Sequence, residues 1–169
     1  AENHKGGRIV VMATSVTLRR QKFADLMDNY AQNAEIIPVP CPGLVNFVEQ
    51  DRTDSQEMMD YLKERFDPLK DRPIDAVVLG CTHYPFLSNV LKRELGSGTE
   101  LIDPSAAVAR ELKHQLSKRG LLSDGAKGKE VFYISGDAEK HRAVIERLWN
   151  SEEALDLRSD PPATKATLS

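Results

Sequence analysis

The densest group of chemically active side chains in this sequence is the run Cys81-Thr82-His83, which places a thiol, a hydroxyl and an imidazole on adjacent residues. The free N–H groups at the start of a helix stabilise a thiolate, and a nearby imidazole accepts or returns the thiol proton. Cys81 is therefore a candidate base or nucleophile. Thr82 and His83 are candidate hydrogen-bonding groups for a carboxylate. Together these residue types suit an anionic small molecule.

Structural roles explain the same residues when each is taken singly. Unpaired cysteines are among the most buried residue types, and threonine is common at helix starts. The occurrence of all three side chains at one turn favours a functional site over three separate structural roles. Cys41, Cys81 and His83 also allow a zinc site, although the sequence lacks the paired ligand spacing that is typical of zinc sites.

The elements that must position this turn alternate between short apolar runs and stretches of helical period, a pattern typical of parallel βαβ units. We predict strands over residues 8–13, 34–41, 75–81, 99–102 and 130–135. We predict helices from Leu18 to Tyr30 and over residues 44–48, 55–69, 85–95, 106–118 and 138–149. The fold class is therefore α/β, with a parallel sheet.

The place of two strands in that sheet follows from their residue types. Residues 75–81 are apolar in succession, which predicts a central strand buried on both faces. Pro38 and Pro40 lack N–H donors, which predicts an edge position for their strand. Ligands in open α/β sheets bind at the carboxyl ends of strands, so the turn at Cys81 lies where a site is expected.

Composition and charge exclude several classes of protein. The chain has 169 residues and a formal net charge of −3 with interspersed signs, which argues against a nucleic-acid partner. No apolar run approaches the roughly 18 residues that a membrane span needs. Two cysteines cannot form a disulfide framework, and no leader pattern opens the sequence. We therefore expect a cytoplasmic protein with reduced thiols and no membrane partner.

Residues 77–87, VVLGCTHYPFL, closely resemble the signature of the glutamate racemases around their second catalytic cysteine. Further segments resemble the same family in the same order, at residues 9–17, 40–49, 102–112 and 132–137. His83 after the Cys-Thr pair favours glutamate, because aspartate racemases of the superfamily usually carry another residue there.

The resemblance implies the Asp/Glu racemase fold, with a complete Rossmann- or flavodoxin-like lobe at residues 1–101. Residues 102–150 are then a crossover helix, a strand and a helix of a second, incomplete lobe. The polar composition from Ser151 onward predicts a disordered tail at 151–169. Apolar side chains of the incomplete lobe, such as Leu112 and Tyr133, are expected to lack packing partners, with self-association or marginal stability as the result.

The activity implied by the resemblance is the interconversion of L- and D-glutamate without a cofactor or metal, which provides D-glutamate for peptidoglycan. Two cysteines flank the substrate Cα in this family, and Cys81 matches one of them. The resemblance assigns His83 to assist Cys81, and Thr82 to bind the substrate together with His83.

Three further residues match positions at the family's site. Thr14 and Thr17, after the first strand, are implied to line the substrate site, and Glu49 matches an acid near it. Cys41 matches a family cysteine outside the catalytic pair and is predicted to be a buried thiol.

The Ala-Cys-Asn-Thr run of the family's first catalytic cysteine does not occur in this sequence, and the family's substrate-gripping Asp-Ser pair has no match in the segments that resemble the family. The chain therefore resembles a C-terminal portion, whose partner is a missing N-terminal lobe or a second copy in a homodimer. Three alternatives stay open: an aspartate racemase-like enzyme, a non-catalytic lobe that binds glutamate, and a lobe that docks onto a partner such as DNA gyrase, which some family members bind.

Overall fold

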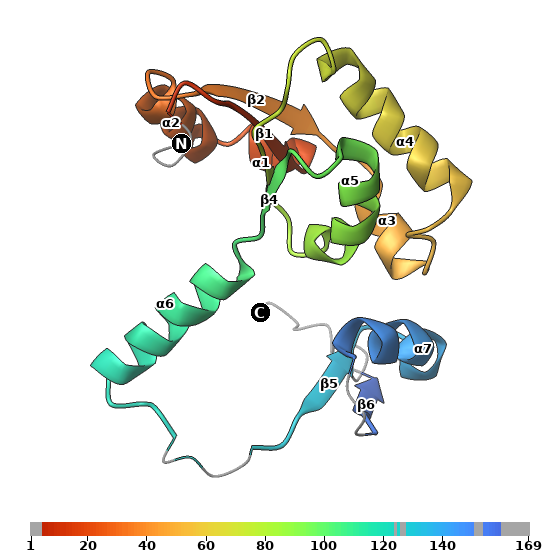
Figure 1. The fold of residues 1–169 in the computed structure, drawn as a ribbon. Helices are drawn as coiled ribbons and strands as arrows, with labels where there is room; N and C mark the ends of the chain where they lie inside the picture. The colour runs from red at the N-terminus through yellow and green to blue at the C-terminus, as the bar shows by residue number, and fades with distance from the viewer. Residues whose placement is uncertain (1–4, 124, 126–127, 151–153, 160–169) are drawn as a thin grey trace, which may run out of the picture. The chain divides into compact units, whose positions relative to one another are not determined.

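The computed structural model describes residues 5–123, 125, 128–150 and 154–159. The chain divides into two compact units, Ala1–Leu121 and Leu122–Ser169 (Figure 1). Both combine helices with parallel strands, so the α/β class is confirmed. Within the described ranges, no helix is both long enough and apolar enough to cross a bilayer.

The first unit is built on a four-stranded parallel sheet with the strand order β2-β1-β3-β4. Its strands are β1 (Arg8–Ala13), β2 (Glu35–Pro40), β3 (Ala76–Leu79) and β4 (Glu100–Ile102). The predicted positions of two strands are confirmed, with β3 inside the sheet and β2 at its edge. An edge strand has one neighbour only, which is why β2 tolerates Pro38 and Pro40.

The helices of the first unit are α1 (Ser15–Leu18), α2 (Gln21–Tyr30), α3 (Leu44–Glu49), α4 (Gln56–Phe66), α5 (Ser88–Leu95) and α6 (Ser105–Lys118), with 3-10 turns η2 (Asp67–Leu69) and η3 (Tyr84–Leu87). Two predicted helices are interrupted. Arg20 is extended and separates α1 from α2. Pro68 lies in η2, which replaces the predicted last turn of α4 because proline cannot continue an α-helix.

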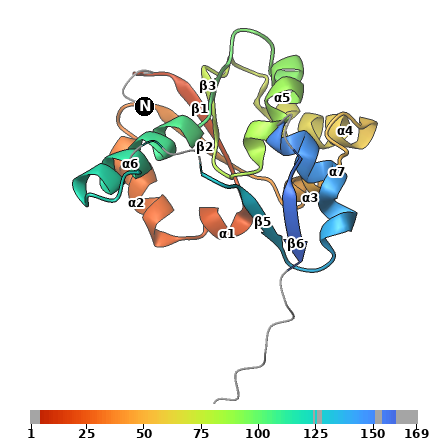
Figure 2. The ribbon, with the colours of Figure 1, turned by 90° about the horizontal axis from the view of Figure 1, so that it is seen from below.

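The two faces of this sheet are covered unequally, with α2 on one side and α4 and α5 on the other (Figure 2). Val10, Met12, Val77 and Leu79 are paired in register and have no exposed surface. The helices that complete this dry core contribute Leu44, Val48, Met58, Leu62, Phe66 and Leu91. No residue of α2 is buried, so the opposite face is packed more loosely.

The second unit holds β5 (Val131–Ile134), α7 (Ala138–Trp149) and β6 (Asp156–Ser159), with β5 and β6 paired in parallel. The strand β6 corrects the expectation of a disordered tail for residues 156–159. Backbone pairing with β5, burial of Leu155 and a hydrogen bond from the Ala138 N–H to Ser159 Oγ (3.0 Å) order a segment whose composition is polar. Residues 151–153 and 160–169 of the expected tail lie outside the described residues.

Helix α6 is grouped with the first unit, whereas the sequence placed a lobe boundary after Leu101. The helix begins three residues after Ile102, the end of β4, so it belongs to that unit by its connection. Its apolar side chains Val108 and Leu112 are 64% and 59% exposed, as was expected of Leu112. The division into a complete and an incomplete lobe stays a prediction.

Candidate active site

Three strands of the first unit's sheet end side by side, and the chain leaves the sheet there, at the edge formed by the carboxyl ends of the strands. β1, β2 and β3 are parallel and aligned at their carboxyl ends, so Thr14, Cys41 and Gly80 emerge side by side. The Cys41 N–H donates to the Ala13 carbonyl (2.9 Å), and the Gly80 N–H donates to the Met12 carbonyl (2.8 Å). The first residues after β1, β2 and β3 are therefore neighbours at this carboxyl edge of the sheet.

Gly80 permits the close approach of β3 to β1 at this edge. A Cβ atom on Gly80 would lie 2.6 Å from the Met12 carbonyl oxygen and 3.3 Å from the Ala13 Cβ, which is closer than real Cβ atoms come to a backbone oxygen. Only glycine fits without displacing one of the strands. The next residue is Cys81, so the thiol is held where the strand ends.

Cys81, His83 and Glu49 form a line of polar groups. The Cys81 Sγ lies 4.0 Å from His83 Nδ1, and His83 Nε2 lies 3.2 Å from Glu49 Oε1. An ionised carboxylate only accepts hydrogen bonds, so in the neutral imidazole Nε2 carries the proton and Nδ1 is left as an acceptor that faces the thiol. The arrangement can take a proton from Cys81 and return it.

The line is accessible from solvent. Cys81 is partly buried, and the side chains of His83 and Glu49 are 32% and 59% exposed. The exposed Thr82 has its Oγ1 3.4 Å from His83 Nδ1. These four residues come from the turn after β3 and from the end of α3, and the structure brings them together. Their roles in a substrate site stay predictions.

Thr14 and Thr17 form a hydrogen-bonded pair of their own at the same edge. Thr14 Oγ1 accepts the Thr17 N–H (3.2 Å) and caps α1, and the two hydroxyls lie 2.9 Å apart. The Thr14 hydroxyl thus has a structural role as a helix cap, and the Thr17 hydroxyl is hydrogen-bonded to it. Their predicted role in lining a substrate site stays a prediction.

Cys41 is a buried thiol, as predicted. It is 1% exposed, and its Sγ donates to the Val39 carbonyl (3.4 Å). Burial raises the pKa of Cys41 to about 11, so the thiol is protonated at neutral pH. Where the structure describes the chain, no three His, Cys, Asp or Glu side chains are grouped as metal ligands, which removes support for a zinc site of Cys41, Cys81 and His83.

Tyr84 is a part of this site to which the sequence analysis gave no role. Its side chain has no exposed surface, and its hydroxyl donates to the Cys41 carbonyl (3.3 Å). Burial raises the pKa of Tyr84 far above its ordinary value. The signal available in the sequence was a tyrosine next to the reactive run, because a buried tyrosine hydroxyl needs a partner.

A hollow of about 370 Å³ lies at the opposite edge of the sheet and is lined by Lys70, Asp71, Arg72, Pro73, Ile74, Leu95, Gly98 and Thr99. These residues precede β3 and β4, so the hollow is separate from the Cys81 turn. Its two cations are already neutralised, since Lys70 pairs with Glu94 and Arg72 with Glu35. The hollow therefore offers no free charge to hold an ion.

Comparison with known proteins identifies relatives of this chain. Residues 1–112 match the family model described as Asp/Glu/Hydantoin racemase. A glutamate racemase of Clostridium perfringens is 43% identical over 121 residues, which are 72% of this chain and 46% of the relative. One of Clostridium botulinum is 43% identical over 123 residues, 73% of this chain and 48% of the relative. The chain spans about half the length of these curated relatives.

Solved structures share the fold. The glutamate racemase of Bacillus anthracis matches with a TM-score of 0.76 and 28% identity, over 94% of this chain and 59% of that one. The glutamate racemase of Francisella tularensis, solved in complex with D-glutamate, matches with a TM-score of 0.77 and 26% identity, over 95% of this chain and 59% of that one. The predicted fold class is confirmed by both.

Proposed function

This chain belongs to the Asp/Glu/hydantoin racemase family, and from that membership we propose that it carries one half of a glutamate racemase active site. The reaction interconverts L- and D-glutamate without a cofactor, and the whole enzyme provides D-glutamate for peptidoglycan. The curated relatives are named for this activity, and one structural relative was solved with D-glutamate bound.

The observation that carries the proposal is the line of Cys81, His83 and Glu49. The Cα proton of an amino acid is a very weak acid, so its removal needs a well-placed base and stabilisation of the developing charge. His83 Nδ1 faces the Cys81 thiol at 4.0 Å and can hold its proton, while Glu49 stabilises the resulting imidazolium. Cys81 then acts as a thiolate base.

Other residues at this edge contact the substrate in the proposal. The exposed Thr82 hydroxyl and His83 hydrogen-bond the substrate carboxylate, and Thr14 and Thr17 line the space beside it. Thr82 has only one partner among the described side chains, at 3.4 Å, so its hydroxyl retains capacity for a ligand.

The proton balance requires a second acid. The Cys81 thiolate takes the Cα proton of one enantiomer and the electron pair stays on Cα, so inversion needs a proton from the opposite face. Cys41 is the other cysteine of this sequence, and it is 1% exposed with its thiol bonded to the Val39 carbonyl, so it does not reach a substrate. The second thiol therefore comes from the part of the relatives' length that this chain does not span, or from a second copy.

The test is deuterium exchange at Cα when the full chain is incubated in heavy water with each enantiomer of glutamate. We expect exchange of one enantiomer without inversion, followed by NMR and optical rotation. Cys81→Ser lowers the exchange rate by about 100-fold or more, the usual contribution of a positioned base. The matched control, Cys41→Ala, removes the other thiol and retains exchange.

Each alternative has its own outcome in this experiment. Equal exchange in Cys81→Ser and the unaltered chain contradicts the base role. Absence of exchange with either enantiomer favours a lobe that binds glutamate or a partner without catalysis. Exchange of aspartate in place of glutamate favours an aspartate racemase-like enzyme.

A further inference from the structure

We propose that Tyr84 is a positioning residue that sets the separation of Glu49 and His83, and through it the proton state of Cys81. The inference rests on the proposed function, because it concerns the same thiol. Tyr84 directly follows His83 in the chain, and Glu49 is the last residue of α3, which begins just after Cys41.

Tyr84 is hydrogen-bonded to both turns that carry the site. Its hydroxyl donates to the Cys41 carbonyl (3.3 Å), in the turn between β2 and α3. Its main-chain N–H donates to the Cys81 carbonyl (3.1 Å), in the turn after β3. The ring has no exposed surface, so it cannot swing aside without opening the core. Tyr84 is thus a fixed link between the two turns.

The separation of Glu49 and His83 depends on such a link. Both side chains are exposed enough that the hydrogen bond between them contributes little by itself and cannot hold the two backbones together. The distance between the Glu49 and His83 side chains is therefore set by the positions of the two turns. If the turns move apart, His83 loses its Nε2 partner, and the tautomer with a free Nδ1 is no longer favoured.

Tyr84 acts through these neighbours rather than on a substrate. Its hydroxyl is turned to a carbonyl inside the core, and burial raises the pKa of Tyr84, so it stays protonated. It has no exposed surface from which to touch a ligand. Its influence on Cys81 passes through the position of Glu49 and His83.

Tyr61 provides a matched control. Its hydroxyl donates to the Pro42 carbonyl (3.1 Å), the residue next to Cys41 in the same turn. Tyr61 comes from α4, however, and not from the turn that carries Cys81. Tyr61→Phe removes a comparable hydrogen bond from the β2–α3 turn while the link between the two turns stays intact.

The experiment compares the full chain with Tyr84→Phe and Tyr61→Phe by two readouts of the folded state. The ¹⁵N shifts of the His83 imidazole report its tautomer, and mass spectrometry of the alkylated peptide reports the rate at which iodoacetamide modifies Cys81. In Tyr84→Phe we expect a mixture of tautomers and alkylation slower by about three- to tenfold, the value of one hydrogen bond. Tyr61→Phe retains both signatures.

Glu49→Gln tests whether the effect passes through the carboxylate. This variant is expected to reproduce the tautomer mixture and the slower alkylation. Adding Tyr84→Phe to Glu49→Gln then causes no further change, because both changes break the same coupled unit. Full additivity of the two changes contradicts the proposed path.

Three results overturn the proposal: wild-type tautomer and alkylation in Tyr84→Phe, equal changes in Tyr61→Phe, or faster alkylation in Tyr84→Phe, which indicates that the turn has simply opened. If Tyr84→Phe is partly unfolded, both measurements are repeated at a lower temperature at which the protein is folded. Neither readout requires turnover. Absence of Cα exchange in the unaltered chain therefore overturns the proposed function alone.

Discussion

At the scale of single residues, the two cysteines show how environment separates two identical side chains. Cys41 is 1% exposed and surrounded by the core, whereas Cys81 is partly exposed with an imidazole 4.0 Å from its sulfur. Burial outweighs the nearby Arg65 and raises the pKa of Cys41, so this thiol stays protonated, whereas a thiol beside an imidazole has an acceptor for its proton. The structure therefore separates an accessible thiol beside an imidazole from a buried thiol, and the role of Cys81 as a base stays a proposal.

The pKa of Cys41 predicts a loss of stability in alkali. Burial raises this pKa from 9.0 to about 11, so above pH 9 the unfolded chain releases a proton that the folded chain retains. The contribution of this thiol to stability is complete below pH 9 and is lost as the pH rises to about 11. Urea unfolding should show a decrease of roughly 2–3 kcal/mol across this window.

Cys41→Ala is the control for the alkaline loss. This variant should be nearly flat from pH 9 to 10, above which Tyr61, whose pKa is raised by burial to about 12, and Tyr84 add their own decrease in both proteins. An equally steep decrease from pH 9 in Cys41→Ala would show that another group causes it.

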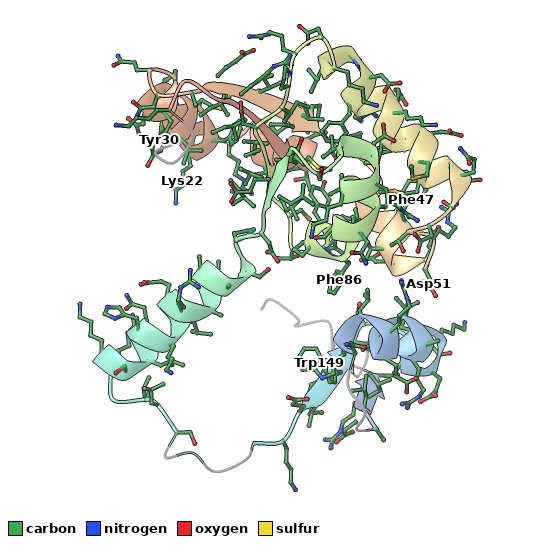
Figure 3. The ribbon with its side chains drawn as sticks, in the orientation of Figure 1. Lys22, Tyr30, Phe47, Asp51, Phe86 and Trp149 are labelled. Atoms are coloured by element: carbon green, nitrogen blue, oxygen red, sulfur yellow. The ribbon has the colours of Figure 1, made fainter. Side chains whose placement is uncertain are left out.

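At the scale of elements, the site depends on two turns that follow parallel strands. Gly80 allows β3 to end against β1, and α3 carries Glu49 back to the turn that holds His83. Figure 3 labels Phe47 on α3, the helix that carries Glu49, and Phe86 in η3, which begins directly after His83. Backbone placement, more than the strength of any one side-chain contact, holds the site together.

Gly80→Ala is expected to destabilise the protein by about 2–4 kcal/mol, because the added methyl group meets the Met12 carbonyl at 2.6 Å within the packed sheet. It should also displace Cys81 and slow its alkylation. Gly98→Ala is the control, since a Cβ there meets nothing within 4 Å. Thermal unfolding of the two variants makes the comparison, and equal stability would contradict the role of the close approach.

Arg8 is expected to hold the opposite edge of the sheet. Its side chain is 9% exposed, and its guanidinium donates to the carbonyls of Leu69 and Arg72 and pairs with Asp71. Arg8→Met should cost about 1–3 kcal/mol, because the hydrogen bonds from the buried guanidinium to these two main-chain carbonyls are lost. Arg72→Met, at a side chain that is 58% exposed, should cost less than about 1 kcal/mol in the same urea titration. Similar losses in both variants would contradict the distinction.

At the scale of the whole molecule, the two units differ in how much core they contain. The first unit holds nearly all of the buried hydrophobic residues, whereas the described part of the second contributes Ala138 and Leu155. A two-stranded sheet is marginal by itself. The exposure of Tyr133, at 61%, agrees with the expectation that side chains after Ile102 lack packing partners.

Amide hydrogen exchange should show that the unit with the smaller core is the less stable one. Amides of β5 and β6 are expected to exchange at least about 100-fold faster than those of β1 and β3, because local opening of the second unit exposes little apolar surface. Exchange followed by NMR on the full chain makes the comparison within one sample. Equal protection in both units would mean that they unfold together, and the expectation of marginal stability would be wrong.

The sequence by itself determined the elements and the place of the chemistry. Strands β1 to β5 and the main helices were predicted because apolar periodicity and proline and glycine positions act within a few residues of each other. The run Cys81-Thr82-His83 was found for the same reason, since its members are adjacent. The resemblance of residues 77–87 then led to the family.

Only the tertiary structure decided which distant residues meet. His83 and Glu49 are 34 positions apart, and Tyr84 and Cys41 are 43 apart, so nothing local encodes their contacts. The same holds for β6, whose polar residues form a strand because β5 lies beside them. Contacts of this kind depend on strand register and on the path of the chain, which a residue's type does not specify.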